Sequence, residues 1–198
     1  MAEAVGTAVK QTRGSVLTRR GRLEDVRYHA SCGGGTSDIE SVFPGTGPGS
    51  VGIDCPCAEP GAAAQQRKWK HTFTSAQLGN LARTLGVGER IVSLRPIQEQ
   101  PWRWSEVQVA GDTGQVQISF LRLRTLLGPS LLRSGRIEGT WPHPGEPIRP
   151  GGGWAVYGTG HGHGAGLCQT GTHLLAERDW SSARILNHYF AGTTVENL

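Results

Sequence analysis

The feature that most constrains this chain is a run from Gly158 to Gly171, which reads Gly-Thr-Gly-His-Gly-His-Gly-Ala-Gly-Leu-Cys-Gln-Thr-Gly. Glycine loses more backbone entropy on folding than any other residue, so such a run is retained only where side chains do not fit. A flexible linker would be rich in glycine and serine and would carry no imidazoles. The run therefore predicts a site at which something lies against the backbone. Its polar side chains are His161, His163, Cys168 and Gln169.

The composition indicates one domain, residues 1–198, with many turns and short strands. The chain has 198 residues, of which 30 are glycine and 11 are proline. That content is typical of short strands and loops rather than of a helical bundle. Residues 33–64 read as one long loop excursion, with a Gly-Gly-Gly run and two Pro-Gly pairs. A compact domain rarely carries so long a loop unless a metal or a substrate-covering role holds it in place.

The charge and hydropathy of the chain exclude several classes of protein. The net charge is +4, from 20 basic and 16 acidic residues. No long basic run or aromatic-basic motif favours nucleic acid, so we expect an Arg-rich solvated surface or an acidic polymer as partner. The first residues lack an apolar core, and no stretch approaches 18 apolar residues. We therefore expect no signal peptide and no transmembrane segment in this chain.

The periodicity of apolar residues predicts an α+β fold with mainly antiparallel strands. Helices fall between groups of strands, and strands are the more numerous. The expected helices are 2–12, 75–85, 121–127, 172–178 and 181–189. The expected strands are 16–18, 26–29, 68–72, 91–97, 104–110, 115–120, a segment at 137, and 154–157. The first two strands are expected to form a hairpin around Arg19-Arg20-Gly21.

Four cysteines suggest either two disulfides or one metal site. They are Cys32, Cys55, Cys57 and Cys168. Cys55 and Cys57 flank a single proline, and so short a loop does not favour a disulfide between them. They are better suited to act together as neighbouring metal ligands.

Three segments of the chain resemble the stage II sporulation protein D / LytB amidase-enhancer family of bacterial cell-wall proteins. The first is the glycine-rich run, similar to the family's Gly-x-Gly-x-Gly-His-Gly-Val-Gly-x-[Ser/Cys]-Gln-x-Gly. The second is Ile-Leu-Asn-His-Tyr-Phe-Ala-Gly-Thr at 185–193. The third is Tyr-His-Ala-Ser-Cys-Gly-Gly-Gly-Thr at 28–36, preceded by a similar lead-in at 8–14. The segments occur in the family's order and cover nearly the whole chain.

The resemblance implies a peptidoglycan-remodelling protein of the cell envelope, as in sporulation and engulfment. Some members of the family are lytic transglycosylases that cleave glycan strands, and others enhance a partner cell-wall amidase. The family's catalytic glutamate stands in a Glu-x-Pro segment that has no match here, so the chain resembles an N-terminally truncated member. No residue is assigned as the catalytic acid. The alternative function is a non-catalytic glycan-binding or amidase-enhancing module.

The resemblance also implies which residues contact the glycan. His163 aligns with the family's histidine, and it either binds sugar hydroxyls or holds the turn. His161 stands where the family usually has tryptophan. Gln169 and Ser31 either bind N-acetyl groups or bridge the two loops. Tyr28 is either a sugar platform or a core aromatic.

If the two loops meet, as the resemblance implies, all four sulfurs converge on one structural Zn²⁺ with tetrahedral geometry. Cys32 then comes from one loop and Cys168 from the other, while His29 or His163 could replace one thiolate. Disulfides between a loop cysteine and one of the Cys-Pro-Cys pair, or four free thiols, remain open. A zinc-dependent hydrolase that uses His161 and His163 is a further hypothesis, and it needs an open coordination position.

Overall fold

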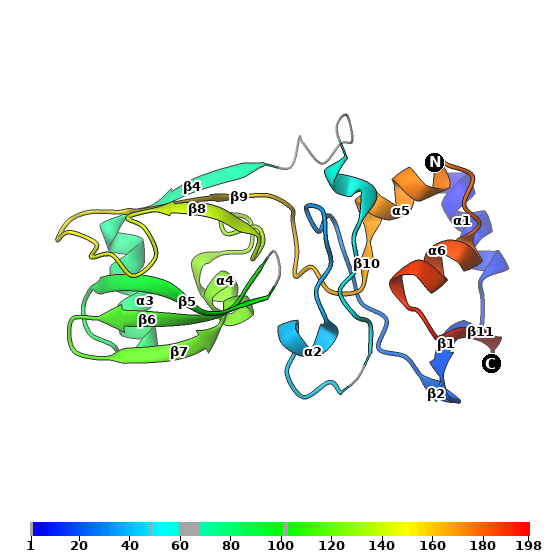
Figure 1. Cartoon of the computed structure of the whole chain (residues 1–198), viewed down its shortest axis with the longest axis horizontal. Helices are drawn as coiled ribbons and strands as arrows, with labels where there is room; N and C mark the ends of the chain where they lie inside the picture. Colours follow the sequence, from blue (N-terminus) through cyan, green and yellow to red (C-terminus); the bar gives the residue numbers. More distant parts are fainter. Residues whose placement is uncertain (1, 48, 60–67, 101–102) are drawn as a thin grey trace.

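The computed structural model describes residues 2–47, 49–59, 68–100 and 103–198. These residues form an elongated molecule with most of its strands at one end and the first and last helices of the chain at the other, as Figure 1 shows. Each end has its own hydrophobic core. We call them the sheet end and the helix end.

The sheet end contains two antiparallel three-stranded sheets and two helices. The strand orders are β4–β9–β8 and β5–β6–β7. The elements are β4 (Trp69–Phe73), α3 (Ser75–Leu85), β5 (Ile91–Gln100), β6 (Arg103–Gly111), β7 (Gln115–Ser119), α4 (Phe120–Leu127), β8 (Ile137–Trp141) and β9 (Trp154–Gly158). Phe73, Val107, Leu123 and Val156 are fully buried between the sheets and helices.

Helix α3 shows how local sequence sets these boundaries. The Thr74 side chain accepts a hydrogen bond from the Gln77 backbone, and the Gln77 side chain accepts one from the Thr74 backbone. This capping box satisfies donors that the first helical turn leaves free. Gly86 ends the helix in the left-handed region, at φ 68°. Leu78 and Leu81 face the core.

The helix end contains a third antiparallel three-stranded sheet and three helices. The sheet has the order β11–β1–β2. The elements are α1 (Ala2–Gln11), β1 (Ser15–Arg19), β2 (Arg22–Leu23), α5 (Gln169–Ala176), α6 (Ser182–Tyr189) and β11 (Thr194–Asn197). The core of this end combines Leu175, Ile185, Tyr189 and Phe190 with the four cysteines.

Two backbone segments pair between the ends, and we call them the junction: residues 27–32 and 158–168. Within it, β3 (Tyr28–His29) pairs in parallel with β10 (Leu167–Cys168). The backbones of Ser31 and His161 exchange two hydrogen bonds, of 3.1 and 2.8 Å. Thr170, at the start of α5, donates to the Ala30 carbonyl through its backbone and its hydroxyl. These hydrogen bonds therefore hold together segments that are more than a hundred residues apart in the sequence.

The α+β class with mainly antiparallel strands is confirmed. The hairpin prediction is wrong in its second strand, because β1 pairs with Arg22–Leu23 and with β11. Tyr28–His29 pairs with β10 instead. Strand β11 is not predicted from the sequence, because its four residues are all exposed and carry no apolar alternation.

The described part of the expected loop 33–64 contains short helices and local pairings. These are α2 (Ile39–Val42) and the 3-10 turn η1 (Pro56–Ala58). Gly35 and Asp54 form an antiparallel bridge across the loop. Residues 60–64 of the predicted excursion lie outside the described residues.

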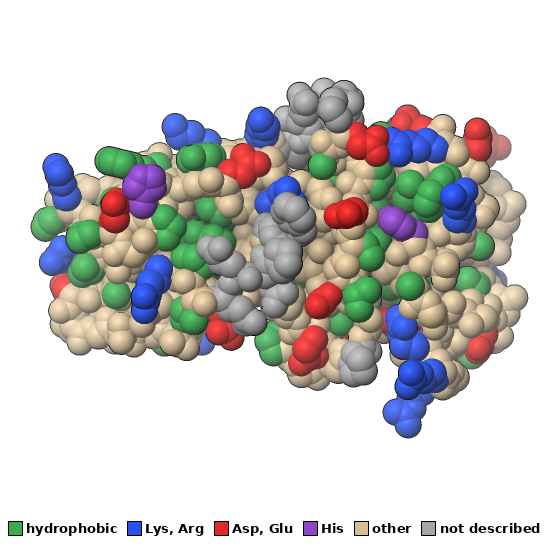
Figure 2. All heavy atoms as spheres, in the orientation of Figure 1, with side chains coloured by type: hydrophobic (Ala, Val, Ile, Leu, Met, Phe, Trp, Pro, Cys, Tyr) green, Lys and Arg blue, Asp and Glu red, His purple; other side chains and the backbone are tan. Residues whose placement is uncertain are grey.

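Charged side chains of both signs share the surface. Figure 2 shows Lys and Arg side chains spread among acidic ones over one face of the molecule.

Val5 and Val9, on the apolar stripe of α1, are 59% and 64% exposed. Across the described residues, none of the helices has the length and apolar character needed to cross a membrane.

Candidate functional site

The four cysteines form one buried cluster where the junction meets the helix end. Cys32 follows β3, Cys55 and Cys57 flank the proline that begins η1, and Cys168 ends β10 and caps α5. All four are buried, and their sulfurs all lie within 4.8 Å of one another. Such a group could bind one metal ion. The predicted use of Cys55 and Cys57 as neighbours in one site agrees with this placement.

The spacing of the sulfurs fits a single ion. A tetrahedral zinc–thiolate site with bonds of about 2.3 Å separates its sulfurs by roughly 3.8 Å. Here Cys32 Sγ and Cys57 Sγ are 3.2 Å apart, and the four side chains are free thiols rather than disulfides. Among the described residues, the group that could hold a metal at this place consists of the cysteines, without His29 or His163.

Negative charge in the cluster concentrates on Cys168. Hydrogen bonds from the other thiols, with Cys32 first, hold the pKa of Cys168 far below its usual range. The same bond to Cys168 raises the pKa of Cys32. The backbone N–H groups of Cys32 and Gly171 also donate to Cys168 Sγ, at 3.3 and 3.4 Å. The surroundings are therefore arranged to stabilise a thiolate, the form of cysteine that binds metals.

Two further side chains enclose the cluster. The Tyr189 hydroxyl lies 3.3 Å from Cys55 Sγ, and burial raises the pKa of that tyrosine. The Arg103 guanidinium is buried and donates through Nη2 to the Cys32 carbonyl at 2.9 Å. Burial lowers the pKa of Arg103 to about 10, so it stays charged at neutral pH. Arg103 is not among the residues that the sequence motifs predict for the site, although its position between Trp102 and Trp104 is a signal of an apolar setting.

The glycines of the run are required by close contacts with the rest of the chain. Four of them have positive φ: Gly160 (85°), Gly162 (114°), Gly164 (84°) and Gly166 (71°). A Cβ at each would collide with a neighbour, namely the Ser31 carbonyl, His29 Cβ, the Arg103 guanidinium and the Arg27 carbonyl, in that order. The backbone is thus bare because segment 27–32 and Arg103 lie against it. The sequence predicts that something packs on this run, and most of that contact is internal.

His163 is held by the backbone through both ring nitrogens. Its Nδ1 accepts from the Ala165 N–H at 3.2 Å, so Nε2 carries the proton and donates to the Tyr28 carbonyl at 3.0 Å. Burial lowers its pKa to about 4, so the ring is neutral at pH 7. The Phe43 ring packs edge-on against it, with centroids 5.0 Å apart. This geometry fits the alternative in which His163 holds the turn.

The other predicted glycan contacts divide into buried and exposed residues. Ser31 is fully buried, and its hydroxyl has no hydrogen-bond partner among the described residues. His161 and Gln169 are exposed, and Tyr28 is 65% exposed. The junction therefore presents an aromatic ring, an imidazole and an amide on its surface.

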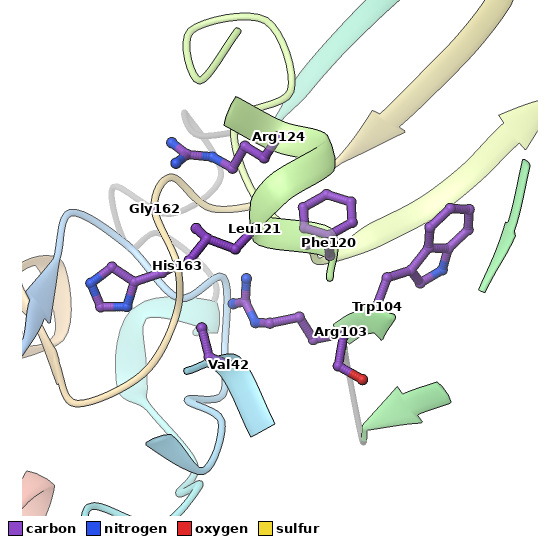
Figure 3. A pocket seen from close by; sticks show the side chains of 10 residues that line it. Val42, Arg103, Trp104, Phe120, Leu121, Arg124, Gly162 and His163 are labelled. Atoms are coloured by element: carbon purple, nitrogen blue, oxygen red, sulfur yellow. The ribbon is translucent and has the colours of Figure 1, made fainter. Parts of the chain in front are cut away.

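A small cavity lies on the sheet-end side of the junction. Figure 3 shows His163 and Gly162 opposite Arg103 from β6 and Leu121 and Arg124 from α4. Its volume is about 20 Å³, which is room for about one water molecule. A saccharide ring is much larger, so this cavity cannot hold one.

Comparison with known proteins places the chain beside a longer relative. No family model matches the chain. It is 26% identical over 192 residues to an uncharacterized protein of Brachyspira hyodysenteriae, across 97% of this chain. The matched part is 48% of that protein, so the chain spans about half the length of its curated relative.

The contacts of the glycines predict that two alanine substitutions lower the unfolding free energy by different amounts. Gly164 and Gly45 have nearly equal φ values of 84° and 86°, but a Cβ at Gly45 meets no atom within 4 Å. Gly45→Ala should cost about 1–2 kcal/mol of unfolding free energy from backbone strain alone. Gly164→Ala should cost about 1–3 kcal/mol more, because Arg103 must move. Urea unfolding measures both, and equal losses would contradict the packing role of Gly164.

The contacts of His163 predict a pH-dependent stability. His163→Ala should lower the unfolding free energy at pH 7 by about 2 kcal/mol, because two hydrogen bonds are lost. Since the folded pKa of about 4 lies below the ordinary 6.5, the unfolded chain takes up the proton first on acidification. The stabilisation is complete above pH 6.5 and is lost as the pH falls toward 4.

The measurement is thermal unfolding of both proteins across that range. The difference in melting temperature between wild type and His163→Ala should become smaller as the pH is lowered. His173→Ala is the control, because that side chain is 74% exposed and should show no such narrowing. A constant gap for His163→Ala would show that the ring is not held in its neutral form.

Proposed function

We propose that this chain is a peptidoglycan-remodelling protein, resembling a lytic transglycosylase, that binds cell-wall glycan strands across the exposed surface of the junction. The observation that supports it most is the pairing of segments 27–32 and 158–168. These are the two segments that carry most of the resemblance to the sporulation and amidase-enhancer family. They are far apart in sequence, yet they lie backbone to backbone and share the cysteine cluster.

The exposed junction residues supply the chemistry that binds sugars. The Tyr28 ring offers an apolar face to a sugar, with a hydroxyl at its edge. Gln169 can donate to and accept from an N-acetyl group, and His161 stands on the neighbouring segment. A small number of polar groups beside an aromatic ring is typical of sites that recognise small molecules. The glycan therefore contacts side chains, while the glycine backbone beneath them fixes their positions.

The metal in the cysteine cluster is proposed to be one structural Zn²⁺. Four thiolates close the coordination shell, and closed sites of this kind stabilise folds. The ion would join the Cys-Pro-Cys loop to the start of α5 and to β3. A hydrolytic zinc site at His161 and His163 is less favoured, because both ring nitrogens of His163 already bond to the backbone.

Glu40 and Glu59 are poorly suited to serve as the acid in glycan cleavage. Cleavage of a glycosidic bond needs a carboxylic acid that keeps its proton near neutral pH. The backbone N–H of Gly45 lowers the pKa of Glu40, and Arg178 lowers that of Glu59. A non-catalytic module that docks on glycan or assists an amidase is thus the second candidate. Cleavage, a sporulation role and an amidase partner are proposed from the resemblance alone, because the chain spans about half the length of the relative that it matches.

The zinc assignment predicts one ion per chain. Metal analysis of the protein purified without chelators should give a 1:1 ratio, and a chelator should lower the melting temperature. Cys168→Ser should lose the metal. Gln169→Ala is the matched control, because it changes the adjacent exposed residue and should retain zinc. A metal-free, equally stable wild type would contradict the assignment.

The glycan assignment predicts a loss of binding without a loss of stability. Tyr28→Ala combined with Gln169→Ala should reduce co-sedimentation with purified peptidoglycan at least tenfold. The melting temperature should change by about 1–2 °C, as for surface substitutions. Tyr157→Ala is the control, because Tyr157 is 45% exposed on β9 at the sheet end. Unchanged binding in the double variant would reject this surface, and new reducing or anhydro ends in mass spectra would assign cleavage.

A further inference from the structure

Two arginines of the sheet end reach the loop that carries the first cysteine. Arg103 begins β6, and Arg136 directly precedes β8. Arg103 Nη2 donates to the Cys32 carbonyl at 2.9 Å. Arg136 lies along the next two residues, because a Cβ at Gly33 would be 2.9 Å from Arg136 Cδ and one at Gly34 would be 3.3 Å from its Nη1. The Cys-Gly-Gly turn is thus enclosed by two guanidinium groups.

The burial of Arg103 needs an electrostatic explanation. The residue is only 5% exposed. Its Nε and Nη1 have no hydrogen-bond partner among the described residues. No carboxylate in the described part of the chain forms an ion pair with it. A buried charge is costly unless an opposite charge lies near it, and Arg136 adds a second positive charge close by.

The cysteine cluster is the neighbour that can balance these charges. Four thiolates around a divalent ion carry a net charge of −2, and the two guanidinium groups carry +2. We propose that Arg103 and Arg136 balance the charge of a tetrathiolate zinc centre, with Arg103 as the positioning residue that fixes the Cys32 backbone. This inference rests on the zinc part of the proposed function and does not depend on glycan binding.

The bound metal would also strengthen the contact between the sheet end and the helix end. Arg103 and Arg136 belong to the sheet end, whereas Cys168 and the Cys-Pro-Cys loop pack on the helix end. A filled site attracts both arginines and so ties the two ends together. Without the metal, the cluster does not carry the net charge of −2 of a tetrathiolate centre, so the buried Arg103 is less well compensated. Removing the charge of Arg103 should therefore lower the stability of the loaded protein but not that of the metal-free protein.

The test compares Arg103→Met, Arg103→Lys and Arg124→Met in the full chain. Zinc affinity is measured by competition with a chromophoric chelator, and melting temperature is measured with and without zinc. Arg103→Met should weaken zinc binding at least tenfold and lower the melting temperature of the loaded protein, but not that of the metal-free protein. Arg103→Lys keeps the charge and should retain most of the affinity. Arg124→Met is the control, because Arg124 lines the same cavity but bonds to the Pro129 and Arg133 carbonyls.

Each result decides a separate point. Equal zinc affinity in wild type and Arg103→Met, or equal losses of melting temperature with and without zinc, would overturn the charge-balance role. If Arg103→Met does not fold, Arg136→Met takes its place, because that side chain is only partly buried. A wild type that binds no zinc would overturn the inference together with the zinc assignment. Co-sedimentation with peptidoglycan decides the glycan proposal independently.

Discussion

The rest of the structure depends on the close packing of segment 158–168 against segment 27–32. Gly160, Gly162 and Gly166 let the two segments approach to a distance that side chains would forbid, and Gly164 leaves room for Arg103. That approach places Cys168 beside Cys32 and fixes the direction in which α5 begins. It also turns Tyr28, His161 and Gln169 outward. The cysteine cluster and the exposed surface of the junction are both consequences of one steric requirement.

Charge is the second constraint, and it acts where the two hydrophobic cores meet. The cysteines belong to the core of the helix end, and Arg103 comes from the sheet end. Neither the thiolate of Cys168 nor the guanidinium of Arg103 is well placed alone in an apolar setting. With a divalent ion bound, the four thiolates would carry the negative charge that balances Arg103, which contacts the cluster through the Cys32 carbonyl. The candidate metal centre is therefore part of the contact between the two ends.

Local elements could be predicted from the sequence, and long-range pairings less so. Helix α3 was predicted closely because its cap, apolar stripe and terminal glycine all lie within a dozen residues. The second strand of the first hairpin was misplaced because the partner of Tyr28–His29 is β10, far along the chain. Arg103 was missed because its partner is a backbone carbonyl, which no side-chain pattern reveals.

The sequence by itself determined the α+β class, the glycine run and the four cysteines as candidate ligands, because these follow from residue type and local spacing. Only the tertiary structure decided what each residue touches. In the folded chain His163 bonds to the backbone through both ring nitrogens, and Ser31 is buried. The glycines of the run pack against Arg103 and segment 27–32. The physical reason is that burial and hydrogen bonding depend on neighbours that are distant in the chain.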